Sequence, residues 1–134
     1  MNIQHIFNAL EIAKAKQARQ GLVDILTKYN ETKKQLEQIA PDFAPCFHEE
    51  HDSTMQQVSR AISAIDNAYA AKTPLDQTAW VITMQRELML LDNVLDIAEM
   101  HISATAAVLT ANVTVVQSTP GICEIRFSYP DEAA

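Results

Sequence analysis

The sequence has few of the residues that interrupt helices and few that cross-link a chain. Only 2 of its 134 residues are glycine and only 2 are cysteine. Glycine supplies left-handed backbone in tight turns, so its scarcity favours long helices over a turn-rich β fold. Cys46 and Cys123 are too few for a disulfide framework, and we therefore expect a protein of the reducing cytoplasm.

Long apolar runs and an excess of basic residues are also absent. The densest apolar stretch, residues 88–91, is far too short to cross a bilayer, and the N-terminal residues contain no continuous apolar segment. We therefore expect neither a membrane span nor a signal peptide. The formal net charge is -7. Nucleic-acid binding needs a basic surface that displaces counterions, so we expect no nucleic-acid partner.

Charge is unevenly distributed along the chain. Residues 1–40 carry 6 basic and 4 acidic side chains, a balance of +2. Residues 41–134 carry the other 4 basic and 13 acidic side chains, a balance of -9. A basic partner, or the basic helix of a second copy, would complement the acidic part.

Two series of large apolar residues recur every three or four positions, which is typical of helices with one buried face. The first series is Met55, Val58, Ile62, Ile65 and Tyr69. The second series is Trp80, Met84, Leu88, Leu91, Leu95, Ala98, Ile102 and Leu109. These series predict a mainly α protein, an antiparallel bundle of three to four helices with a C-terminal β-hairpin.

The expected helix boundaries follow from caps and prolines. Residues 2–40 predict one long helix, or two helices that break near Gly21. Two prolines favour a loop over residues 41–52, with the next helix beginning at Ser53 or Thr54. Thr73-Pro74 predicts the start of a third helix that reaches about residue 110 and can break near residues 103–105.

The C-terminal residues change character. Residues 122–129 alternate apolar and polar side chains, and Pro120-Gly121 suits a tight turn before them. We predict one domain over residues 1–134, with a helical bundle in 1–111 and a hairpin in 112–130. A lone hairpin is marginal in water, so we expect it to lie on the helices or to pair with another copy.

The densest group of candidate metal ligands is the segment from Cys46 to Asp52. Imidazole, thiolate and carboxylate are ligands that zinc accepts, and His48, Glu49 and His51 are the candidates here. The segment matches no standard zinc spacing, and the simpler interpretation is a solvated loop whose acidic residues favour the following helix. We therefore predict no cofactor and keep these three residues as a metal hypothesis.

A second candidate group lies on the predicted third helix. Asp92, Asp96 and Glu99 fall on one helical face, where they form either a solvated acidic surface or a docking face for a partner. Trp80 is a further candidate for partner binding, because tryptophan is enriched at interaction hot spots. Carboxylates can also hold Mg²⁺. The order Glu49-Glu50, then Asp96-x-x-Glu99, resembles the acidic helices of all-α nucleotide pyrophosphohydrolases, without their spacing.

These features favour a non-catalytic interaction protein, such as an adaptor, assembly factor or inhibitor, that acts as a homo-oligomer through apolar and acidic surfaces. Its expected partners are a second copy of itself and another protein. A small-molecule or nucleotide-binding helical protein is one alternative, and a metal-dependent nucleotide hydrolase is another. No Walker loop, dinucleotide-binding turn or Ser–His–Asp order is present, which favours a role without catalysis. Such a small, acidic helical chain is typical of bacterial or phage accessory proteins.

Overall fold

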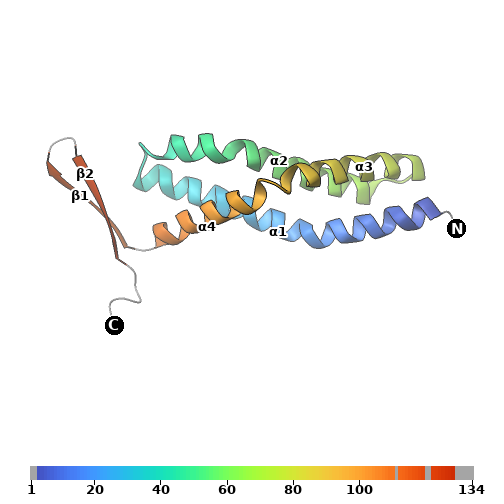
Figure 1. Ribbon diagram of the computed structural model, residues 1–134, viewed down its shortest axis with the longest axis horizontal. Helices are drawn as coiled ribbons and strands as arrows, with labels where there is room; N and C mark the ends of the chain where they lie inside the picture. The colour runs from blue at the N-terminus through green and yellow to red at the C-terminus, as the bar shows by residue number, and fades with distance from the viewer. Residues whose placement is uncertain (1–2, 111, 120–121, 129–134) are drawn as a thin grey trace.

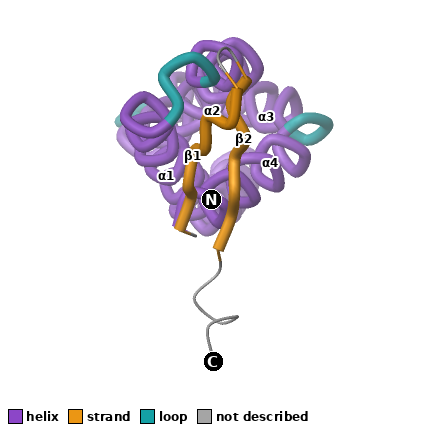
Figure 2. The backbone as a smooth tube through the Cα atoms, turned by 90° about the vertical axis from the view of Figure 1, so that its left-hand side faces the viewer, coloured by secondary structure: helices purple, strands orange, loops and turns teal. Residues whose placement is uncertain are grey.

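The protein is a bundle of helices arranged as three antiparallel rods. The structure, a computed structural model, describes residues 3–110, 112–119 and 122–128. Helix α1 (Ile3–Ile39) runs the length of the bundle, and α2 (Ala44–Ala70) returns beside it. Helices α3 (Pro74–Leu91) and α4 (Leu95–Thr110) follow one another along the third rod (Figure 1). Figure 2, which looks along the bundle, shows the helices grouped around a common interior.

The core is formed along the inward faces of all four helices. Helix α2 is central to it: Val58, Ala61, Ile65 and Ala68 are completely buried. The small alanine side chains let α2 and α3 approach closely, and the contact between these two helices is the most extensive between any two helices of the fold. Helix α3 contributes Val81, Met84 and Leu91, and α4 contributes Ala98 and Ile102.

Polar contacts fix how the rods lie against one another. The buried Asn8 of α1 donates from Nδ2 to Oγ1 of Thr78 in α3 at 2.9 Å. The Arg19 guanidinium of α1 binds both carboxylate oxygens of Asp66 in α2, at 2.7 and 3.0 Å. The Arg19 guanidinium also holds the pKa of that carboxyl below its usual value. Hydrogen bonds of this kind have directional requirements that apolar contacts lack, so they specify the alignment of the helices.

The predicted mixed fold class is corrected for the bundle, which contains no β structure over residues 3–110. Helices account for 91% of residues 3–110, and no strand occurs among these residues, so the bundle itself is entirely helical. Strands β1 (Asn112–Thr119) and β2 (Ile122–Ser128) pair antiparallel with each other beyond the end of the bundle (Figure 1). Their main contact with a helix is that of β1 with α4, which directly precedes it. The expectation that the hairpin lies on the helices is therefore wrong, and the alternative, that it pairs with another copy, stays a prediction.

The predicted start of the second helix is also wrong. Helix α2 begins at Ala44, so residues 46–52 are helical and not a loop. Pro45 occupies the first turn of α2, where its missing N–H would have no intrahelical partner and its fixed φ angle suits the helix. Proline therefore begins this helix, and the side chains of the Cys46–Asp52 segment are placed at helical spacing.

The break in the third rod lies earlier than the sequence predicted. Helices α3 and α4 are separated by residues 92–94, whereas residues 103–105 are helical. The turn closes with hydrogen bonds from the Asp92 N–H to the Met89 carbonyl and from the Val94 N–H to the Leu91 carbonyl. Asp92-Asn93 favours a turn because both side chains compete for backbone hydrogen bonds. The cap at Thr73 is confirmed, since its hydroxyl accepts from the Asp76 N–H at 3.2 Å.

The helices were also compared with the length and hydrophobicity that a membrane span requires. Over the described residues, each helix is either too short or too polar to pass through a bilayer.

Helix α1 is continuous through Gly21, and this generates a stability prediction. A methyl group added at Gly21 would meet no atom within 4 Å. Since alanine is about 1 kcal/mol better than glycine inside a helix, Gly21→Ala should raise the melting temperature by roughly 3–5 °C. Thermal unfolding followed by circular dichroism measures this change. A lower melting temperature would mean that α1 bends at this position in solution.

Candidate functional site

The most concentrated chemistry in the described chain lies between α2 and α4. Glu50 and His51 come from α2, and His101 comes from α4. One potential ligand atom from each residue lies within 4.8 Å of the other two. The Glu50 carboxylate is 3.2 Å from Nδ1 of His101 and 3.9 Å from Nε2 of His51. Among the residues that the structure describes, no other group of three or more such side chains converges in this way.

Aromatic side chains pack against the buried His51 ring and hold it in place. Phe47, one turn earlier on α2, meets the His51 ring edge to face with centroids 4.8 Å apart. Tyr29 of α1 stacks on Phe47 at 5.6 Å. The His51 side chain is buried, whereas the side chains of Glu50 and His101 are substantially exposed.

Burial affects the protonation of His51. Removal from water lowers the pKa of His51, the neighbouring Glu50 carboxylate partly opposes that shift, and His101 adds to it. The His51 imidazole is therefore neutral at physiological pH, with a ring-nitrogen lone pair available. A cavity of about 160 Å³ adjoins the three side chains and is otherwise lined by Thr54, Val94, Ile97 and Ala98.

Only one of the three residues predicted to bind metal belongs to this cluster. His51 does, but His48 lies toward α1, with its Nε2 atom 3.5 Å from the Glu37 carboxylate and without a hydrogen bond to any described residue. Glu49 is exposed and lies outside the cluster. The sequence prediction missed Glu50 because it treated residues 46–52 as a loop, and it missed His101 because its partners lie far away in the sequence. Helical spacing from Pro45 would have placed His51 on the inward face with Phe47 and Met55.

The residues predicted to bind a partner do not form one site. Trp80 is 38% exposed and borders a depression between α2 and α3. Asp92 lies in the turn before α4, whereas Asp96 and Glu99 lie on α4 and are exposed. The break at residues 92–94 interrupts the helical face on which the three carboxylates were expected to align. Within the described part of the chain they do not converge on a common cation position.

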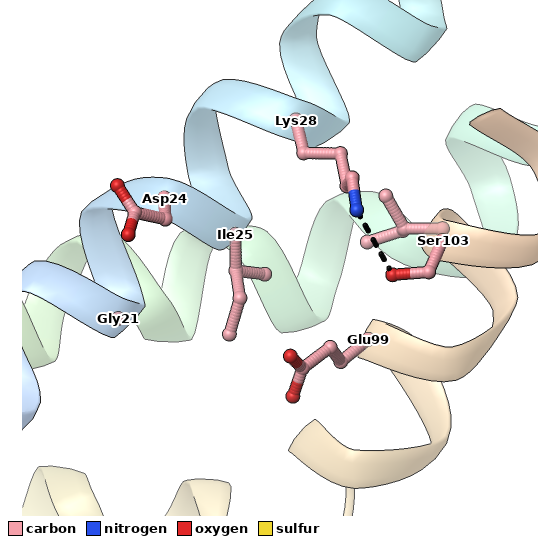
Figure 3. A pocket seen from close by; sticks show the side chains of 7 residues that line it. Gly21, Asp24, Ile25, Lys28, Glu99 and Ser103 are labelled. Carbon is pink, nitrogen blue, oxygen red and sulfur yellow. Dashed lines mark hydrogen bonds between the residues drawn. The ribbon is translucent and has the colours of Figure 1, made fainter. Parts of the chain in front are cut away.

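Glu99 instead borders a hollow between α1 and α4. This space of about 220 Å³ is also lined by Gly21, Asp24, Ile25 and Lys28. Figure 3 shows the Glu99 carboxylate directed into the gap between the two helices, while the Lys28 ammonium donates to the Ser103 hydroxyl at 3.3 Å. Lys28 lines this hollow and already links α1 to α4 through Ser103, so its ammonium group has a structural role there.

Tyr29, which supports the cluster through Phe47, also generates a prediction. Its buried hydroxyl donates to Asp52, and burial raises the pKa of Tyr29, an effect that the Asp52 hydrogen bond increases. Tyr29→Phe should lower the free energy of unfolding by about 1 kcal/mol at neutral pH. The raised pKa stabilises the fold below pH of about 10, and this contribution is lost as the pH rises through the folded-state pKa.

Urea unfolding at neutral and alkaline pH measures this difference. The matched control is Tyr69→Phe, because Tyr69 is exposed and its ring packs under the Lys16 ammonium. The control should be close to wild type at both pH values. Equal effects of the two substitutions would contradict the role assigned to the Tyr29 hydroxyl.

No protein-family model, no curated protein and no solved structure matches this chain.

Proposed function

We propose that this protein is a non-catalytic interaction protein that acts as a helical homo-oligomer. The observation that carries this proposal is a row of exposed large apolar side chains along the third rod, which we call the α3–α4 stripe. It consists of Leu75, Ile82, Met89, Leu90, Val94, Ile97 and Met100. Leu75, Ile82 and Met89 recur every seven residues, the spacing with which one helix packs along another. Exposed apolar side chains that gather on one surface often mark interaction sites.

A second exposed apolar surface lies at the beginning of α1. It consists of Ile3, Ile6, Phe7 and Leu10, which we call the α1 patch. Their spacing of three and four residues puts them on one face of the helix. The α1 patch is therefore a short amphipathic helix face of the kind that docks on an apolar stripe.

Charge complementarity favours a second copy as the occupant of the stripe. Residues 74–110 carry 5 acidic side chains and 1 basic side chain, a balance of -4. Residues 3–39 carry 6 basic and 4 acidic side chains, a balance of +2. Pairing of one stripe with another would bring like charges together, whereas docking of α1 along the stripe brings the basic residues that follow the α1 patch, from Lys14 onward, toward acidic side chains. We therefore place α1 of one copy on α3–α4 of the next.

A complementation experiment tests this arrangement. Ile82→Lys with Met89→Lys disables the stripe, and Ile6→Lys with Leu10→Lys disables the α1 patch. All four side chains are exposed, so folding should survive, as circular dichroism can verify. Light scattering coupled to size exclusion at tens of micromolar should find oligomers for wild type and a chain mass near 14.9 kDa for each variant. An equimolar mixture of the two variants should associate again, because one intact contact joins them.

The matched control is Gln56→Lys with Asn67→Lys, which adds the same charge to exposed positions of α2 outside both surfaces. This control should remain oligomeric. A monomeric wild type would overturn the proposal. So would an α1-patch variant that associates by itself as the wild type does, since the stripe would then pack against another stripe.

A further inference from the structure

We propose that Glu50, His51 and His101 form a binding site for a divalent transition-metal ion, with Zn²⁺ as the best-fitting ion, that joins α2 to α4. The site differs from the metal hypothesis of the sequence in two of its three residues. None of its three ligands belongs to the α3–α4 stripe or to the α1 patch, although the stripe residues Val94 and Ile97 line the cavity beside the site.

The geometry is close to that of a bound ion. Zinc lies about 2.0–2.2 Å from imidazole nitrogen and carboxylate oxygen, so tetrahedral ligand atoms are about 3.4 Å apart. The Glu50 oxygens are already 3.2 and 3.9 Å from the nearer nitrogens of the two imidazoles. Glu50 is 60% exposed and His101 is 43% exposed at the side chain, so both can close onto an ion by changing rotamer.

The donor set selects the class of ion. Two imidazoles and one carboxylate suit zinc and its neighbours in the first transition row, whereas Mg²⁺ and Ca²⁺ prefer sites made of oxygen atoms. The carboxylate also offsets one of the two positive charges that the ion brings to the helix boundary. We therefore expect no comparable binding of Mg²⁺.

The side chains around the site hold His51 in one orientation, whereas the exposed Glu50 and His101 can adjust to an ion. Phe47 packs against the His51 ring and Tyr29 stacks on Phe47, so the imidazole that lies deepest is oriented before an ion arrives. Fixed orientation of a ligand lowers the entropy lost on binding. With three protein ligands, a tetrahedral ion keeps a fourth position for water, and the adjoining cavity of about 160 Å³ leaves space for it.

An ion at this position would also have a structural effect. Helix α4 is held mainly by α1, and its contact with α2 is small. A bond from both Glu50 and His51 through the ion to His101 would attach α4 directly to α2. Because the unfolded chain lacks this arrangement, binding stabilises the folded state by mass action.

Zinc titration of the untagged protein by isothermal calorimetry, together with thermal unfolding, tests the site. We expect one Zn²⁺ per chain and a higher melting temperature with Zn²⁺ than with Mg²⁺. His101→Ala should weaken zinc binding by at least about 100-fold and remove the thermal shift. His101 is partly exposed, so this substitution leaves the core intact. Glu50→Gln, which keeps the side-chain shape, should weaken binding by about 10-fold or more.

Two controls make the result specific. His48→Ala with Glu49→Gln removes the other candidate ligands on α2, and Cys46→Ser removes an exposed thiol that can bind zinc by itself. Both variants should retain wild-type affinity and stoichiometry. The proposal is overturned if zinc binds at well below one ion per chain, if His101→Ala binds as wild type does, or if either control abolishes binding.

Discussion

The burial of α2 between its neighbours is the constraint on which the rest of the structure depends. Its inward face combines small alanines with Val58 and Ile65, all nearly or completely inaccessible to water. Alanine at these positions removes the bulk that would separate the helices, so the backbones of α2 and α3 can approach closely. Because α2 lies against both α1 and α3, its rotation sets which residues face each of them.

The same rotation determines the chemistry at the other end of α2. Once Pro45 starts the helix, Phe47, His51 and Met55 share the inward face, and Tyr29 closes against Phe47. Glu50 is left at the edge, within reach of His101 on α4. A structural requirement, the continuation of a buried helix face, thus brings together two imidazoles and a carboxylate that are distant in sequence. The cluster supports the metal proposal, while the uncovered apolar residues of α3 and α4 support the proposal of self-association.

Much of the helical architecture could be predicted, because apolar periodicity reports directly on burial. Val58, Ile65, Met84, Leu91 and Ile102 were assigned to inward faces and are buried, whereas Tyr69 and Trp80 of the same two series are exposed. The Thr73 cap and the beginning of α3 at Pro74 follow from local backbone chemistry. Periodicity did not locate the break between α3 and α4, since the apolar series continues across it. There the turn-forming tendency of Asp92-Asn93 prevails over the periodic pattern.

The candidate site was less accessible to sequence reasoning. Proline can end one helix or begin the next, and the choice at Pro45 decides whether seven following residues form a loop or an amphipathic helix. His101 could not be assigned to a site at all, because its partners on α2 are about fifty residues earlier in the chain. By itself the sequence determined that long helices form and which side of each is apolar, because these depend on local propensity and spacing. Only the tertiary structure decided which helices meet, and therefore that Glu50, His51 and His101 converge, because such contacts depend on how buried faces pack in space.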